Sequence, residues 1–281
     1  MPDRIVQVGH SQDADDAFMF HALSSGAVTV PGLQFEHVLA DIQTLNEWAA
    51  DGKLDVTAIS VHALAHVADR YAVLTHGASM GDGYGPLVVS RDPAMTPDKL
   101  SRVTIAIPGT MTSAYLALSI CCPGFDWVAM HFDAILPAVV RGDVAAGLLI
   151  HEGQLTHPQF GLHPVLDLGV WWKQQTGLPL PLGVNVIRRD LEPPLQRDVS
   201  RALHDSVEYA LTHREDALRY AMQYGRGVDA ETADLFVSMY VNEWTLNMGD
   251  AGRRAIRLLL QRGAEAGLTP AEVDLVFVGV D

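Results

Sequence analysis

A unit of helix, glycine and strand occurs twice in this chain, ninety residues apart. In each copy a charged residue follows the glycine, and the apolar strand leads directly to a polar side chain, Ser60 in the first copy and His151 in the second. The first copy consists of the helix Ile42–Asp51, Gly52 and the strand Val56–Ser60. The second consists of the helix Asp133–Arg141, Gly142 and the strand Ala146–Ile150. Alternation of this kind is typical of α/β folds, in which helices connect parallel strands. Two unrelated α/β units could also share this order.

Strands and helices alternate around both copies. Further predicted strands are Arg4–Gly9, Leu33–Leu39 and Val103–Ile107. Further predicted helices are Ala17–Ser24, His62–Arg70 and Ala114–Cys122, and the region after Glu192 is predicted to be helical over 192–212, 214–224, 230–241 and 250–266. The sequence therefore predicts an α/β fold that ends in a group of helices.

Two extended apolar segments, Gly85–Ser90 and Leu180–Ile187, are suited to connect domains, because each is preceded by glycine or proline. Two crossings between domains would make the middle of the chain an inserted domain. We therefore expect a discontinuous first domain, residues 1–88 plus 187–281, and an inserted second domain, residues 89–186.

Charge and composition exclude several classes of protein. The net charge is −15 and no basic cluster occurs, which argues against a nucleic-acid-binding surface. The N-terminal stretch has no basic segment followed by a long apolar run, and no apolar segment approaches the roughly 18 residues of a membrane helix. The adjacent Cys121 and Cys122 are interpreted as small buried residues. We expect a cytoplasmic protein without a membrane partner. The sequence does not determine its oligomeric state.

Ligands of open α/β sheets bind beyond the carboxyl ends of the strands. The predicted strands place four segments there, namely Ser11–Asp16, Ser60, Pro108–Ala114 and His151–Glu152. The third of these begins a helix, so its free N–H groups and its hydroxyls favour a carboxylate or phosphate. In the alternative interpretation Thr112 or Ser113 only caps the helix. The segment lacks the GK[ST] of a nucleotide triphosphate loop.

His151 is the candidate general base, because an imidazole at a strand end in a cleft titrates near neutral pH. A purely structural role is the alternative. The acidic residues Asp13, Asp15 and Asp16 are interpreted as a solvated turn in which Asp13 caps the helix, and no metal site is predicted. The pair Trp171–Trp172 could stack on a planar ligand or pack in an interface.

Four segments resemble the corresponding parts of the 1,4-dihydroxy-6-naphthoate synthases, and in order and spacing the resemblance covers almost the whole chain. They are GYGPLVVSR (83–91), GLLIHEGQLTHPQFGL (147–162), VLDLGVWWKQQTGLPLPLG (165–183) and YVNEWTLNMG (240–249). In the first turn, Ser11 and Asp16 match the family's SPCPND-type pattern. The residues between them depart from its Pro, Cys, Pro and Asn; they are Gln12, Asp13, Ala14 and Asp15.

The resemblance implies a two-domain fold of the periplasmic-binding-protein type II class that has been adapted to catalysis. It implies a carbon–carbon lyase of the futalosine route to menaquinone, which converts cyclic dehypoxanthine futalosine to 1,4-dihydroxy-6-naphthoate and dihydroxyacetone without a cofactor. The family's proton-accepting histidine falls on His151. Its ligand contacts fall on Ala58, Ile59 and Ser60 at a strand end and on Ser113 and Ala114 at a helix start.

Residue-level reasoning adds Ser11 and Thr112 as candidate contacts to a small carboxylated substrate, which local donors must hold because the whole chain is acidic. Two alternatives to the synthase remain. One is chorismate dehydratase, an enzyme of the same fold and pathway, and the other is a small-carboxylate-binding protein without catalysis.

Overall fold

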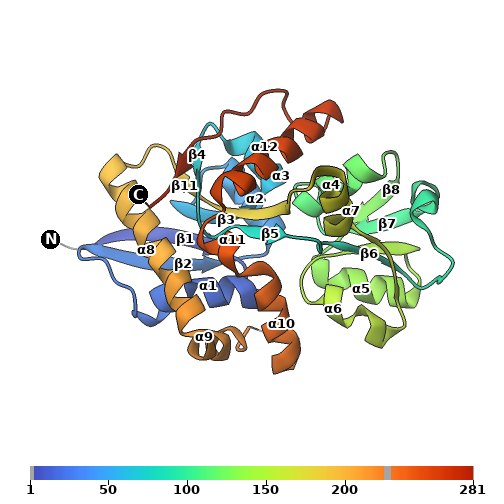
Figure 1. Cartoon of the computed structure of the whole chain (residues 1–281), viewed down its shortest axis with the longest axis horizontal. Coiled ribbons are helices and arrows are strands. Elements are labelled where there is room, and N and C mark those ends of the chain that lie inside the picture. Colours follow the sequence, from blue (N-terminus) through green and yellow to red (C-terminus); the bar gives the residue numbers. More distant parts are fainter. Residues whose placement is uncertain (1–2, 225–228, 281) are drawn as a thin grey trace.

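Two β-sheets form the centres of two lobes, and helices cover both of them (Figure 1). The computed structural model describes residues 3–224 and 229–280. The seven-stranded sheet has the order β12-β4-β11-β3-β1-β2, with β5 beside β11. Its strands are β1 (Arg4–His10), β2 (Leu33–Leu39), β3 (Val56–Ser60), β4 (Tyr71–Leu74), β5 (Ser79–Gly81), β11 (Leu180–Arg188) and β12 (Phe277–Val278). The five-stranded sheet, in the order β10-β6-β9-β7-β8, contains β6 (Leu87–Ser90), β7 (Thr104–Ile107), β8 (Asp126–Ala129), β9 (Ala146–Leu149) and β10 (His163–Asp167).

Helices α1 to α3 and the C-terminal helices α8 to α12 lie with the larger sheet, and α4 to α7 lie with the smaller one (Figure 1). The helices of the first lobe are α1 (Ala14–Ser25), α2 (Ile42–Ala50), α3 (Val61–Val67), α8 (Pro193–Thr212), α9 (Arg214–Ala221), α10 (Ala230–Tyr240), α11 (Glu243–Leu246) and α12 (Gly249–Glu265). Those of the second are α4 (Ser113–Cys121), α5 (Phe132–Arg141), α6 (Gly153–Thr156) and α7 (Leu168–Thr176), with 3₁₀ turns at Pro97–Arg102 and His157–Phe160. The predicted C-terminal group of helices is confirmed.

Both sheets are mixed rather than purely parallel. Strand β1 is parallel to β2 and β3, and β7 is parallel to β8 and β9, as the alternation of strands and helices predicts. The two extended segments of the sequence become β6 and β11, which run antiparallel to β9 and β3. Each of these strands carries the chain from one lobe into the other and joins the sheet that it reaches.

The repeated unit occurs once in each sheet. In the first lobe α2 leads to the fully buried strand β3, and in the second lobe α5 leads to the fully buried strand β9. Gly52 and Gly142 both have positive φ, +67° and +82°, and Gly142 caps α5 in the left-handed conformation. The carboxyl ends of the two strands therefore deliver Ser60 and His151 to the same pocket, which both residues line.

We propose that each lobe is a domain, with residues 1–88 and 187–281 in one and residues 89–186 in the other. The chain leaves the larger sheet after β5 and returns to it in β11. These limits fall inside β6 and β11. Because the whole of β6 belongs to the smaller sheet and the whole of β11 to the larger one, the sheets favour domain limits a few residues earlier, before each strand begins.

Trp171 and Trp172 lie on α7, and neither lines the pocket described below. Trp172 is fully buried, and its indole N–H donates a hydrogen bond to the carbonyl of Pro179 over 3.0 Å. Arg262 of α12, in the first lobe, lies over the Trp172 ring at 5.1 Å, so Trp172 packs where the two lobes meet. Cys121 and Cys122 are free thiols and are half-buried, so they are less enclosed than predicted.

Within the described ranges, no helix is both long and apolar enough to cross a membrane.

Two glycines allow the first crossing to pass close to α7. A Cβ atom on Gly169 would lie 1.8 Å from the carbonyl oxygen of Tyr84, and one on Gly85 would lie 2.8 Å from the Gly169 nitrogen. Backbone atoms cannot move aside as a flexible side chain can, so any side chain at Gly169 would force the crossing and the helix apart.

We therefore expect Gly169→Ala to lower the free energy of unfolding by about 1–3 kcal/mol, the usual cost of overpacking. Urea denaturation followed by circular dichroism measures this loss. Gly153→Ala is the matched control, because its Cβ would meet its nearest neighbour at an ordinary 3.6 Å. Equal midpoints for the two variants would contradict the close approach.

Candidate active site

One pocket lies where loops of the two sheets meet, with an empty volume of ≈ 750 Å³ that is partly open to solvent. Its lining includes every residue that the sequence proposed for substrate binding or catalysis. These are Ser11, Ala58, Ile59, Ser60, Thr112, Ser113, Ala114 and His151. The structure thus brings the predicted residues together around one space, and their roles there stay predictions.

The hydroxyl groups at the start of α4 are already engaged within the protein. Thr112 Oγ1 accepts a hydrogen bond from the backbone of Tyr115 over 3.2 Å and donates to the carbonyl of Gly109 over 2.8 Å. Ser113 Oγ donates to the carbonyl of Leu182 over 2.5 Å. The backbone N–H groups of Ser113 and Ala114 have no hydrogen-bond acceptor within residues 3–224 and 229–280. Backbone donors, rather than the hydroxyls, are therefore available to an anion here.

Ser60 is fixed by Asn46, a buried residue of α2 that the sequence analysis missed. The Ser60 N–H donates to Asn46 Oδ1 over 2.8 Å, and Asn46 Nδ2 donates to Ser60 Oγ over 3.1 Å. Asn46 is 1% exposed, so both interactions are shielded from water. This arrangement leaves the Ser60 hydroxyl proton able to donate into the pocket.

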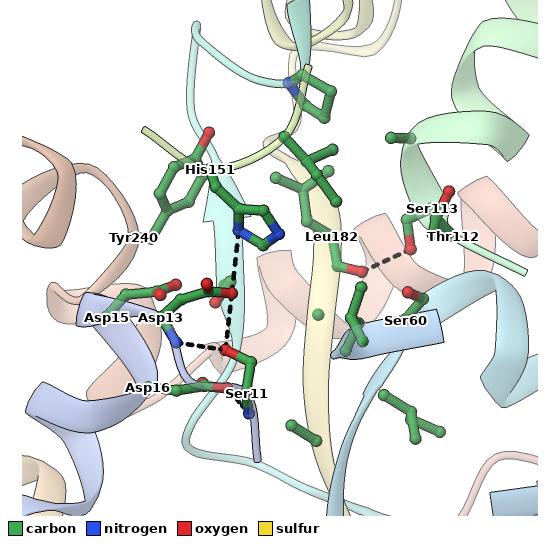
Figure 2. A pocket seen from close by; sticks show the side chains of 18 of the residues that line it. Ser11, Asp13, Asp15, Asp16, Ser60, Thr112, Ser113, His151, Leu182 and Tyr240 are labelled. Carbon is green, nitrogen blue, oxygen red and sulfur yellow. Dashed lines mark hydrogen bonds and ion pairs between the residues drawn. The ribbon is translucent and has the colours of Figure 1, made fainter. Parts of the chain in front are cut away.

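His151 contacts the opposite lobe through Asp13 (Figure 2). Its Nδ1 lies 3.1 Å from Asp13 Oδ2, and its Nε2 is buried and has no hydrogen-bond partner in the protein. The backbone of His151 has φ +74°, the only positive φ outside glycine in the described residues. Such a conformation costs free energy and persists where the surrounding structure enforces it, often at functional sites. Among the described histidines, His151 is the one that lines this pocket.

Asp13 does not cap α1 as predicted. It occupies the N-cap position, because α1 begins at Ala14 instead of Ala17, but its side chain makes no capping hydrogen bond. Its Oδ2 accepts a hydrogen bond from Ser11 Oγ over 2.8 Å and faces His151. The sequence showed only the local turn, whereas the partner of this carboxylate comes from the other sheet.

The acidic turn is not solvated, which corrects a second expectation. Asp13 and Asp16 are 3% and 8% exposed. Asp16 Oδ2 accepts a hydrogen bond from the Ser11 backbone over 2.6 Å, and burial nevertheless raises the pKa of Asp16 to about 6. The pKa of Asp15 is raised well above its usual range, first by burial and then by the charges of Asp16, Asp13 and Glu152. Asp15 is half-buried, so the turn is largely but not fully enclosed.

These pocket carboxylates do not gather around one point as metal ligands. Within the described part of the chain, potential ligand atoms come together on α8 instead. One atom each of His204, Asp205 and Glu208 lies there within 4.8 Å of the other two. None of the three lines the pocket. The prediction that the pocket holds no metal stays a prediction.

Tyr240 and Gln154 were also missed by the sequence analysis. Both line the pocket, and the Tyr240 hydroxyl donates to Gln154 Oε1 over 2.8 Å, which joins α10 to α6. Burial raises the pKa of Tyr240, so its hydroxyl stays protonated. Tyr240 begins the 240–249 segment that carried part of the family resemblance, and no residue-level signal distinguished it.

Solved structures share this fold. A protein of Archaeoglobus fulgidus matches with a TM-score of 0.90 at 46% sequence identity, over 94% of this chain and 98% of that protein. The alkanesulfonate-binding protein of Xanthomonas axonopodis pv. citri matches with a TM-score of 0.74 at 11% identity, over the whole of both chains. At that identity the second likeness shows the fold alone, and it is the periplasmic-binding-protein fold that the resemblance implied.

Sequence comparison points to one biosynthetic family. The family described as menaquinone biosynthesis matches residues 6–265. A 1,4-dihydroxy-6-naphthoate synthase of Thermus thermophilus is 42% identical over 273 residues, which cover 97% of this chain and 99% of that enzyme.

The raised pKa of Asp16 makes a signed prediction for stability. Between the ordinary value of 3.8 and about 6, the folded protein holds a proton that the unfolded chain has lost, so stability falls as pH rises through this window. Asp16→Asn removes that dependence while its amide oxygen can still accept the Ser11 N–H. We expect the unfolding free energy of the native protein, measured relative to this variant, to fall by about 2 kcal/mol from pH 4 to pH 6. Urea titrations across this range measure the difference, with exposed Asp250→Asn as control; a difference independent of pH would contradict the assignment.

Proposed function

This chain belongs to the menaquinone biosynthesis family, and from that premise we propose that it is a 1,4-dihydroxy-6-naphthoate synthase with His151 as its general base. The observation that carries the proposal is the geometry of His151. One ring nitrogen is held by Asp13, and the other, at the edge of the substrate-sized pocket, has no protein partner. An imidazole so placed can accept a proton from a bound molecule.

The proposed reaction is that of a carbon–carbon lyase. Cyclic dehypoxanthine futalosine loses a proton, one carbon–carbon bond breaks, and the products are 1,4-dihydroxy-6-naphthoate and dihydroxyacetone. Formation of an aromatic ring favours this direction, so positioning of the substrate and one base supply what the step requires. The proposal includes no cofactor and a cytoplasmic location.

The two sides of the pocket differ in charge, and this difference orients the substrate (Figure 2). Ser60 and the free N–H groups of Ser113 and Ala114 offer donors on one side, and Asp13, Asp15 and Asp16 lie on the other beside His151. A substrate carboxylate is stabilised at the donor side and repelled from the acidic side. The hydroxylated part of the substrate, which can donate hydrogen bonds to carboxylates, therefore lies near His151.

Asp13 acts on the reaction through His151. A carboxylate acceptor at Nδ1 holds the ring proton on that nitrogen, so the neutral imidazole presents an unprotonated Nε2 to the substrate. When Nε2 takes the substrate's proton, the negative charge of Asp13 stabilises the imidazolium. Ser11 holds the same oxygen of Asp13, Oδ2, through a hydrogen bond from its hydroxyl over 2.8 Å.

We test the function by anaerobic incubation of the purified protein with cyclic dehypoxanthine futalosine and, separately, with chorismate, followed by mass spectrometry of the products. Dihydroxynaphthoate from the first substrate is the expected result. Turnover of chorismate alone would identify a chorismate dehydratase instead. Binding without turnover of either substrate would identify a carboxylate-binding protein.

His151→Ala is expected to lower kcat by about 10²–10⁴-fold, the usual contribution of a general base, while substrate still binds. Stopped assays give kcat, and isothermal titration calorimetry gives the dissociation constant. The matched control is His163→Ala, which removes an exposed imidazole of β10. Full activity in the His151 variant would overturn the assignment of the base.

Asp13→Asn is expected to lower kcat by about 10²-fold or more with little change in KM, because the amide keeps the shape and loses the charge that stabilises the imidazolium. The exposed Asp250→Asn serves as the control for loss of one carboxylate. Steady-state kinetics separates the two parameters, and a variant with raised KM but normal kcat would show that Asp13 only shapes the pocket.

A further inference from the structure

Asp15 is a pocket carboxyl group to which the proposed mechanism gives no role of its own. It lies in the first turn of α1, lines the pocket, and stands on the same side as His151 and Tyr240 (Figure 2). Its Oδ1 atom is inaccessible to solvent and has no hydrogen-bond partner in the protein. An ionised carboxylate with a sealed, unpartnered oxygen is strongly disfavoured.

The neighbouring acids are provided with donors, and Asp15 Oδ1 is not. Asp13 faces the His151 ring and accepts from Ser11 Oγ, and Asp16 accepts from the Ser11 N–H. Both can therefore carry their charge more readily than Asp15. In the described part of the chain, no lysine or arginine lines the pocket to offset a further negative charge.

The titratable groups that face Asp15 are Asp13 and Asp16 on its own turn, Glu152 after β9, and Tyr240 on α10, which burial keeps protonated. The three carboxylates favour the neutral form of Asp15, whereas a hydrogen bond with the Asp16 backbone favours the charged form and is the smallest of these effects. Burial first, and then the charges of Asp16, Asp13 and Glu152, raise the pKa of Asp15. A carboxyl group that stays protonated has one O–H donor and one carbonyl acceptor, and enzymes use such neutral acids to donate hydrogen bonds to substrate oxygens.

We propose that Asp15 takes part in the site as an uncharged carboxylic acid and donates a hydrogen bond to an oxygen of the substrate near His151. A protonated Asp has the planar shape of an Asn side chain, with a donor group on one side and an acceptor oxygen on the other, so Asp15→Asn keeps a donor at this place. The identity of the substrate rests on the proposed function; the protonation of Asp15 does not.

The protonation is tested without any substrate, by infrared difference spectroscopy of the native protein against Asp15→Asn near neutral pH. A neutral acid has a carboxylic carbonyl stretch that a carboxylate lacks, so this band should disappear in the variant. Asp250→Asn, in which an exposed carboxylate is removed, should leave the band unchanged. A spectrum in which Asp15→Asn removes only carboxylate bands would overturn the proposal, whatever reaction the protein catalyses.

The role in binding is tested by comparing Asp15→Asn with Asp15→Ala in the turnover assay. The amide still donates, so we expect the alanine variant to have about 10–10²-fold lower kcat/KM than the asparagine variant, the loss of one hydrogen bond to the substrate. As pH rises and Asp15 ionises, the native enzyme loses activity, and Asp15→Asn lacks that loss. Equal impairment of both variants would overturn the role in binding. If the native protein turns over neither substrate, the proposed function fails, and the infrared result still decides the protonation of Asp15.

Discussion

The contact between Asp13 Oδ2 and His151 Nδ1 joins two loops that follow strands of different sheets, β1 and β9. Because each lobe contributes one partner, the imidazole is oriented only when the lobes are together. The positive φ of His151 fits this dependence, since a strained backbone persists when surrounding contacts enforce it. The orientation of the proposed base thus depends on a contact to which both lobes contribute.

The pocket separates donors from acids, and this separation serves a fold that is acidic overall. A net charge of −15 would repel an anionic substrate from the surface in general. In the proposed function, the N–H groups at the start of α4 and the hydroxyl of Ser60 give the substrate carboxylate a local place to bind. On the opposite side Asp13 and Asp16 are supplied with internal donors, whereas Asp15 remains neutral in our proposal.

The fold and much of the pocket follow from local sequence patterns, because a buried strand and the helix before it are encoded by adjacent residues. The repeated unit located Ser60 and His151, and the turn before α4 located Ser113 and Ala114. Contacts between the lobes could not be predicted in this way. The acidic turn looks solvated in the sequence, because the loop that buries it comes from the other sheet, and Tyr240 reaches Gln154 across 86 residues.

In the proposed mechanism, Asp13 fixes His151 with its Nε2 free to accept a proton. Nitrogen NMR of protein carrying ¹⁵N-labelled histidine, with His151→Ala used to assign the resonances, reports which ring nitrogen bears the proton at a pH where the enzyme turns over. We expect a neutral ring protonated at Nδ1, and we expect Asp13→Asn to disturb this signal while His163 keeps its own. A ring protonated at Nε2 would show the opposite, because His151 could not then act as the base.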